Sequence, residues 1–154
     1  MKTQKFISKS PEETIGFGEH LAKSLKEGDI VCFFGDLGSG KTTFIKGIAK
    51  GLKIGPTKVN SPTFVLMNIY HGRLPLFHFD FYRLDGIEGI SSIGYDEFLY
   101  GDGISVVEWA DRLGSLMPDE YLRVDLNHKK VDERVIQLSA IGRRYQNIVE
   151  KVKV

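Results

Sequence analysis

The feature that most constrains this chain is a glycine-rich octapeptide, GDLGSGKT, at residues 35–42. It follows the apolar run IVCFF (residues 30–34), which lacks polar alternation and therefore indicates a strand covered on both faces. After it, apolar residues recur at helical spacing in TTFIKGIAKGL (residues 42–52). The sequence therefore predicts a buried strand, a tight loop and a helix in direct succession.

The octapeptide fits the pattern G-x-x-x-x-G-K-[ST], which is the phosphate-binding loop, or P-loop. Glycines at positions 35, 38 and 40 allow successive backbone N–H groups to point at phosphate oxygens without interfering side chains. The following helix adds the positive end of its dipole. We expect Lys41 to reach the β- and γ-phosphates and the Thr42 hydroxyl to ligate Mg²⁺. A chance glycine turn is the alternative, and the flanking strand and helix argue against it.

Two acids end apolar segments further along the chain. Asp80 follows LFHF, and Glu108 follows ISVV. Because parallel α/β sheets gather ligands at the carboxyl ends of their strands, Thr42, Asp80 and Glu108 could converge on one cation. Glu108 would then either bind Mg²⁺ or polarise an attacking water. The alternative for each acid is a solvated residue at a strand end.

Four further residues carry weaker signals. We interpret His78 as a packed histidine, because no second histidine stands nearby to share a metal. Trp109 is either a core residue or a partner contact. Thr63, in NSPTFVL, either senses a γ-phosphate from a switch-like segment or simply begins a strand. The single cysteine, Cys32, is expected to be a buried core thiol.

The rest of the chain indicates an α/β sandwich with a mixed sheet. A helix should begin with Ser10 as N-cap, Pro11 in the first turn and Glu13 completing a capping box, and should stop at Gly28 and Asp29. Strands are predicted at residues 63–70, 74–82 and 103–109, a hairpin at 120–128 and 132–142, and a last helix within 143–154.

The bulk properties narrow the class of protein. A chain of 154 residues fits one domain, spanning residues 1–154. A formal net charge of +1 provides no global basic field for holding nucleic acid. The amino terminus lacks the apolar core of a signal peptide, and no apolar run approaches the roughly 20 residues that span a bilayer. We therefore expect an intracellular, soluble domain.

Four motifs together resemble those of one family. GDLGSGKTTF, NSPTF, HFDFYRL and VVEW occur in this order and spacing, and they are similar to the TsaE (YjeE) family of bacterial P-loop ATPases. The resemblance covers most of the chain. It implies a P-loop NTPase-like three-layer sandwich with a mixed, mainly parallel sheet and added antiparallel hairpins.

The resemblance also implies a function. Members of that family are cytoplasmic, bind ATP with Mg²⁺ and hydrolyse it slowly alone. They act with TsaB and TsaD in forming the threonylcarbamoyl group on the adenosine next to the tRNA anticodon, and are thought to reset that complex. By this resemblance, the protein would contact transfer RNA only indirectly, through the complex.

The resemblance also implies a set of site residues, found by matching each motif. They are the phosphate-binding residues, a switch-like threonine, two acids and two residues that lie near the base of the nucleotide. These are Gly35, Asp36, Leu37, Gly38, Ser39, Gly40, Lys41, Thr42 and Thr43, then Thr63, Asp80 as the Walker B acid and Glu108, and finally Pro11 and Lys130. The family often has Ala where this chain has Ser39, a change that should not matter.

Other functions remain as alternatives. A small P-loop kinase would need an acceptor pocket and usually an arginine-rich lid, and no lid-like insertion is visible in the sequence. A GTPase is disfavoured because NHKKVD only mimics the [NT]-K-x-D guanine motif. A nucleotide-gated binding module, whose hydrolysis is incidental, would transmit its signal through a conformational change in a partner.

Overall fold

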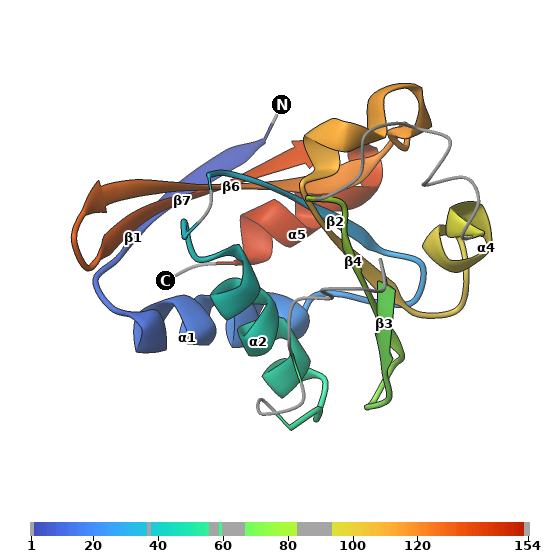
Figure 1. Ribbon diagram of the computed structural model, residues 1–154, viewed down its shortest axis with the longest axis horizontal. Coiled ribbons are helices and arrows are strands. Elements are labelled where there is room, and N and C mark those ends of the chain that lie inside the picture. Colours follow the sequence, from blue (N-terminus) through green and yellow to red (C-terminus); the bar gives the residue numbers. More distant parts are fainter. Residues whose placement is uncertain (1, 37, 56–58, 60–66, 83–93, 153–154) are drawn as a thin grey trace.

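The computed structural model describes residues 2–36, 38–55, 59, 67–82 and 94–152. In this part of the chain one sheet of seven strands runs in the order β1-β7-β6-β2-β5-β4-β3, with helices packed on it (Figure 1). The strands are β1 (Thr3–Ser8), β2 (Ile30–Phe34), β3 (Met67–Tyr70), β4 (Leu76–Asp80), β5 (Ile104–Glu108), β6 (Tyr121–Lys130) and β7 (Glu133–Ile141). The helices are α1 (Pro11–Ala22), α2 (Lys41–Gly51), α4 (Tyr95–Leu99) and α5 (Gln146–Lys151), with 3-10 helices η2 (Ala110–Leu116) and η3 (Arg143–Tyr145).

The centre of the sheet is parallel and its margins are antiparallel. Strand β2 pairs in parallel with β5 on one side and with β6 on the other, and β5 continues in parallel to β4. Antiparallel pairing adds β3 to β4, and β7 and β1 beyond β6. The register sets Glu108 opposite Phe33 and Asp80 opposite Glu108. The carboxyl ends of β2, β5 and β4 therefore meet at one edge.

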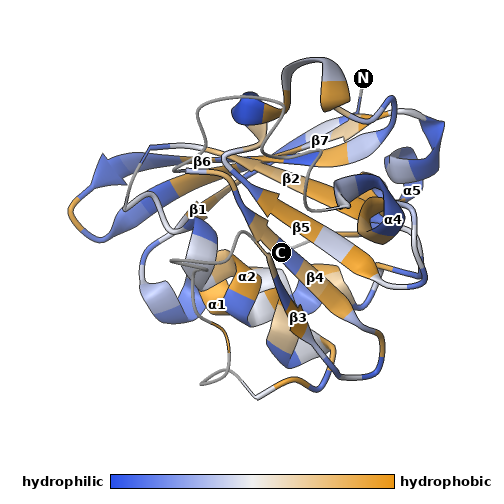
Figure 2. Ribbon diagram, turned by 45° about the vertical axis from the view of Figure 1, so that its right-hand side comes forward, coloured by the Kyte–Doolittle hydropathy of each residue, from blue (hydrophilic) through white to orange (hydrophobic). Residues whose placement is uncertain are grey.

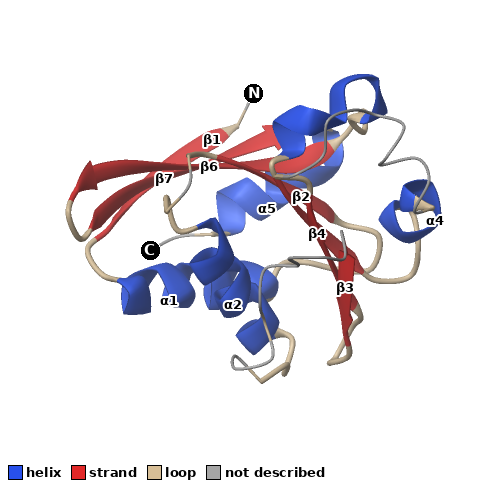
Figure 3. Cartoon of the chain, viewed as in Figure 1, coloured by secondary structure: helices blue, strands red, loops and turns tan. Residues whose placement is uncertain are grey.

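Helices lie on both faces of this sheet (Figure 3). A separate cluster of buried apolar residues fills the space on each face. One contains the apolar faces of α1, α2 and α5 with alternate strand residues such as Val31, Phe33 and Val106. The other contains residues of α4 and η2 with the intervening positions, such as Cys32 and Val107. Hydrophobic colouring accordingly runs along β2, β5 and β4, whereas the far ends of β6 and β7 are hydrophilic (Figure 2). Burial on both faces explains why the central strands lack polar alternation.

Several predicted elements are confirmed. The strand at 30–34, the helix after the glycine loop, the strand within 103–109, the hairpin and a short last helix all form. Ser10 Oγ accepts a hydrogen bond from the Glu13 N–H at 3.1 Å, and Glu13 Oε1 accepts one from the Lys9 N–H at 3.0 Å. The expected Ser10 cap therefore forms at the start of α1, but Glu13 reaches back to the residue before the N-cap and not to the Ser10 N–H of a standard capping box. Of the strand predicted at 63–70, only residues 67–70 are described.

The structure corrects two points. Helix α1 ends at Ala22 rather than at Gly28, because the chain turns after its buried face, and Lys23, Ser24 and Leu25 donate to carbonyls three residues back. Strand β1 was not predicted from its short, mostly polar sequence. It forms because the β7 edge supplies a full antiparallel register from Thr3 to Ser8.

None of the described helices combines the length and the apolar character that crossing a membrane would require. Cys32 is buried, as expected, and burial raises the pKa of its thiol well above the ordinary range.

Candidate functional site

The glycine loop connects the carboxyl end of β2 to the amino end of α2. Gly35, Gly38 and Gly40 all have positive φ, at 146°, 75° and 103°. At Gly35 an added Cβ would lie 2.3 Å from the Leu126 carbonyl oxygen of β6, so any side chain there would collide with backbone. The sequence requirement for glycine is thus a matter of both dihedral angle and space.

Lys41 is the first residue of α2, and its ammonium folds back over the loop. It donates to the carbonyl oxygens of Gly35 and, at 3.1 Å, of Asp36. Its Nζ also lies 4.0 Å from the centroid of the Trp109 ring. The residue is only 5% exposed, and burial lowers the pKa of the ammonium against the opposing pull of the Glu108 charge. Lys41 is therefore a poorly hydrated cation held at the loop.

The start of α2 differs from the start of α1. Within the described chain no side chain caps it, and Gly40 at the N-cap is left-handed. The first backbone N–H groups of a helix need acceptors from outside its own ladder. Ser39 Oγ, buried beside them, also has no hydrogen-bond partner among the described residues. A helix start without a side-chain cap in the described chain, with a cation beside it, is suited to binding an anion.

Glu108, at the end of β5, joins the loop to the sheet. The Thr42 hydroxyl donates to Glu108 Oε1 at 3.0 Å, so two of the residues expected to converge lie in contact. The other oxygen, Oε2, lies 2.6 Å from His78 Nε2. Glu108 is 3% exposed and His78 is fully buried. This carboxylate is therefore fixed from two sides.

Asp80 stands next to Glu108 in register and is half-buried. Its Oδ1 accepts a hydrogen bond from the Tyr82 N–H at 3.0 Å. Burial, and then the negative charge of Glu108, raise the pKa of Asp80. The two acids and Thr42 thus belong to one cluster at the edge where β2, β5 and β4 end.

Trp109 packs against residues of the candidate site. Its backbone is left-handed (φ 58°), and its ring packs between Lys41 and the Tyr82 ring, whose centroid is 4.9 Å away. It therefore forms a wall of the same cluster. The left-handed turn directs the chain from β5 into η2.

Other predicted residues are placed less decisively. Pro11 opens α1 with an exposed side chain, and Thr43 lies half-buried in the first turn of α2. Lys130 is exposed at the end of β6. Leu37 and Thr63 fall outside the described residues, so their predicted roles stay predictions.

Sequence reasoning missed the role of Arg134. This residue of β7 donates through Nη1 to the carbonyl oxygens of Lys130 and Val131, at 3.4 and 3.1 Å, and through Nη2 to that of Gly38 at 3.4 Å. The β6–β7 turn is thereby tied to the glycine loop. Only the pairing of β6 beside β2 brings them together, so no local pattern could have signalled it.

Within the described residues, no group of three or more His, Cys, Asp or Glu side chains is arranged to hold a metal ion by itself. A magnesium ion in a P-loop protein needs fewer protein ligands, since it keeps waters and takes phosphate oxygens. Thr42 and Glu108 place two adjacent oxygen atoms here, of the kind that this ion prefers.

Comparisons with known proteins agree with this geometry. The family model "Threonylcarbamoyl adenosine biosynthesis protein TsaE" matches residues 8–136. The chain is 40% identical over 153 residues to the tRNA threonylcarbamoyladenosine biosynthesis protein TsaE of Bacillus subtilis, covering 99% of this chain and 95% of that protein. It is 42% identical to the protein of the same name from Treponema pallidum, covering 78% of this chain and 88% of that protein.

A solved structure shares the whole fold. The crystal structure of YdiB from Bacillus subtilis superposes with a TM-score of 0.82 at 36% identity, covering 98% of this chain and 94% of that one. Family model, sequence relatives and fold all lead to one conclusion. The chain belongs to the TsaE family of tRNA threonylcarbamoyladenosine biosynthesis proteins.

Proposed function

We propose that this protein binds ATP with Mg²⁺ at residues 35–43 and hydrolyses it slowly when alone. In this proposal it is a cytoplasmic ATPase that acts with TsaB and TsaD, and resets the transferase complex that forms the threonylcarbamoyl group on tRNA. The observation that carries the proposal is the convergence of Lys41, Thr42 and Glu108 at the loop between β2 and α2.

The loop fits a polyphosphate for three reasons. Its glycines hold conformations in which side chains would be strained or would collide. Helix α2 begins without a capping side chain in the described chain, so its first N–H groups can serve an anion. The Lys41 ammonium already bonds two carbonyl oxygens, which it can exchange for the more negative oxygens of a phosphate.

The metal would be held by Thr42 and Glu108, with Asp80 acting through water. Bound Mg²⁺ would neutralise the charge that develops on the phosphates. The raised pKa of Asp80 fits this role, because burial disfavours its charged form and the neighbouring Glu108 carboxylate repels it in the absence of a cation. A divalent ion would remove that repulsion.

Glu108 has two candidate tasks, as a metal ligand and as the group that polarises water. Its Oε1 is within hydrogen-bond distance of Thr42, which favours the metal role for that oxygen. The carboxylate would orient the attacking water through whichever lone pairs the metal leaves free. Both tasks require the carboxylate to stay in a fixed rotamer.

The first test is calorimetry of ATP with Mg²⁺. Lys41→Ala should weaken binding by about 1.5–3 kcal/mol, the range for a lost charged hydrogen bond. Lys50→Ala is the matched control, because Lys50 lies at the other end of α2 and its side chain makes only an exposed ion pair with Glu19 among the described contacts. Equal ATP affinity in the Lys41 variant and the wild type would refute the phosphate-binding role.

The second test separates turnover from binding. Glu108→Ala should retain ATP binding and lose both hydrolysis and the cycling of TsaB and TsaD, assayed by their copurification with and without ATP. Undiminished partner cycling would instead support a nucleotide-gated module. Stoichiometric transfer of the γ-phosphoryl group to a nucleoside or sugar, rather than to water, would favour the kinase alternative.

A further inference from the structure

The Glu108 carboxylate depends on a residue that belongs to neither the loop nor the acidic pair. His78 lies two positions before Asp80 on the same face of β4, opposite Val106 of β5. That placement puts its ring behind Glu108, away from the loop, where it is fully buried. Its Nε2 lies 2.6 Å from Glu108 Oε2, while Thr42 holds Oε1. The carboxylate is thus held between a hydroxyl of the loop and a buried imidazole.

The surroundings of the ring select one tautomer. Nδ1 of His78 is buried and has no hydrogen-bond partner among the described residues. If Nδ1 carried a proton, that N–H would be buried without an acceptor, at the cost of its desolvation. We therefore assign the Nε2–H tautomer, in which Nε2 donates to the carboxylate.

A packing role alone does not account for this arrangement. The ring does contact apolar surroundings, and the Tyr70 ring centroid is 6.2 Å away. However, an aliphatic side chain would fill the same space without leaving a buried nitrogen unpaired. A buried polar group tolerates that cost when its other atom makes a strong, oriented hydrogen bond.

We propose that His78 is a positioning residue, which fixes the Glu108 rotamer through Nε2 so that Oε1 stays at Thr42. The effect of His78 on ATP hydrolysis rests on the function proposed above. The hydrogen bond between His78 and Glu108 does not depend on that function. Groups that orient a metal ligand in this way typically contribute about 10–100-fold in metal affinity or activity.

The first experiment needs no nucleotide. Long-range ¹⁵N–¹H correlation spectra of the full-length protein in EDTA should show one histidine as a fixed Nε2–H tautomer, and that signal should vanish in His78→Gln. Glu108→Ala should shift it or release it into tautomer exchange. An Nδ1–H tautomer, or a His78 signal indifferent to Glu108→Ala, would overturn the proposal whether or not the protein hydrolyses ATP.

The second experiment separates positioning from packing. His78→Leu should lower hydrolysis and raise the Mg²⁺ concentration at half-saturation by about 10–100-fold, with ATP affinity in EDTA unchanged within about twofold. His78→Gln can place an amide N–H where Nε2 was, and should recover most of the loss. His71→Leu, which removes an exposed histidine, should match the wild type. Equal defects in the Leu and Gln variants, or wild-type behaviour of His78→Leu, would contradict the positioning role.

If the wild type itself neither binds nor hydrolyses ATP, the proposed function fails, and the spectra still decide whether the His78–Glu108 bond exists. If His78→Leu does not fold, the spectra and the His78→Gln kinetics decide the matter, because a glutamine variant with wild-type rotamer control must retain the Mg²⁺ dependence.

Discussion

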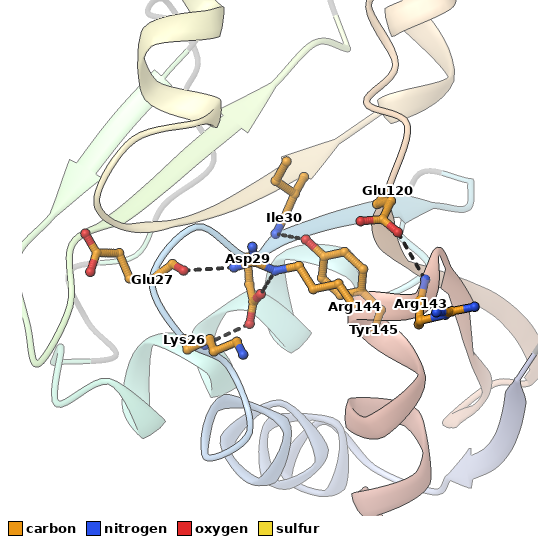
Figure 4. Close-up of polar contacts among 8 residues, drawn as sticks. All are labelled: Lys26, Glu27, Asp29, Ile30, Glu120, Arg143, Arg144 and Tyr145. Carbon is orange, nitrogen blue, oxygen red and sulfur yellow. Dashed lines mark hydrogen bonds and ion pairs between the residues drawn. The ribbon is translucent and has the colours of Figure 1, made fainter.

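The two ends of β2 differ in how their polar groups are paired. At the amino end the buried Asp29 carboxylate is paired twice (Figure 4): it accepts hydrogen bonds from the Lys26 N–H and from Arg144 Nε, both at 2.8 Å. The Tyr145 hydroxyl accepts from the Ile30 N–H at 2.9 Å. At the carboxyl end, the Lys41 ammonium rests on backbone carbonyls. Ser39 Oγ has no partner in the described chain.

The difference in hydrogen-bond pairing shows which end of β2 stabilises the fold and which end costs stability. The paired Asp29 carboxylate and Tyr145 hydroxyl fix the strand at its amino end, which we call the anchor. At the other end, Lys41 is desolvated and the Glu108 charge opposes ionisation of Asp80, so these groups cost stability in the protein without a ligand. One strand of five residues thus links a rigid support to a site under electrostatic strain.

The largest expected effect is at the anchored end. Arg144→Met should destabilise the fold by about 3 kcal/mol, the low end of the range for breaking a buried ion pair, because Asp29 is fully buried while the arginine side chain is 38% exposed. Urea denaturation measures the loss. Arg143→Met is the matched control, since only its backbone N–H takes part in the contacts shown in Figure 4. ATP affinity should not change in either variant, and a stable Arg144 variant with impaired ATP binding would reverse the comparison.

Tyr145→Phe should cost about 1.5 kcal/mol, because it leaves the buried Ile30 N–H without its acceptor. Burial raises the pKa of Tyr145 from an ordinary 10.0 to about 12. The folded state therefore favours the neutral phenol, and its stability falls as pH rises from 10 through about 12. The variant should lose part of this alkaline dependence in pH-resolved thermal denaturation.

Tyr95→Phe is the control for that measurement, because the buried Tyr95 hydroxyl has no partner within the described chain. It should be as stable as the wild type at neutral pH. A Tyr95 variant that is as unstable as the Tyr145 variant would show that the phenol ring environment, and not the Ile30 hydrogen bond, matters.

At the carboxyl end of β2, near the candidate site, a substitution should stabilise the fold and not destabilise it. Asp80→Asn should raise stability at neutral pH, by less than about 2 kcal/mol, because it removes a half-buried charge repelled by Glu108. Since the pKa of Asp80 is raised in the folded protein, the wild type regains stability as pH falls and the carboxyl is protonated. The advantage of the variant should therefore shrink in acid. Thermal denaturation from pH 7 to pH 4 measures it, and a destabilised Asp80→Asn protein would contradict the idea of strain at this end.

The smallest effect is expected for Ser39→Ala. Its hydroxyl is buried and has no partner among the described residues, so its removal should change stability by no more than about 0.5 kcal/mol. Chemical denaturation against the wild type measures it. A loss above 1.5 kcal/mol would indicate a hydrogen bond that the described contacts do not include.

The residues of the candidate site could be predicted from the sequence, whereas those of the anchor at the amino end of β2 could not. The P-loop, Thr42, Asp80 and Glu108 stand out because their chemistry demands particular residues beside apolar runs, and the structure brings them together. The burial of IVCFF and the Ser10 cap of α1 likewise follow from local physics.

Contacts between distant segments could not be predicted. The Asp29–Arg144 pair joins residues far apart in the chain, and Gly28 and Asp29 looked only like a helix stop. The Arg134 contact with Gly38 and the His78–Glu108 bond likewise depend on strand order and register. The pairing of β1 depends on the edge that β7 presents. A single sequence does not encode such choices in any local window.

The position of β2 between β5 and β6 has a consequence for biosynthesis. Val31 pairs with Leu122, and the Leu126 carbonyl lies against Gly35, so the earliest central strand is completed only by one of the last. A nascent chain on the ribosome must therefore carry β2 with one flank open until most of the protein has been translated. Premature termination before β6 would expose an apolar edge of the kind that promotes aggregation, and such fragments should be targets for chaperones and proteases.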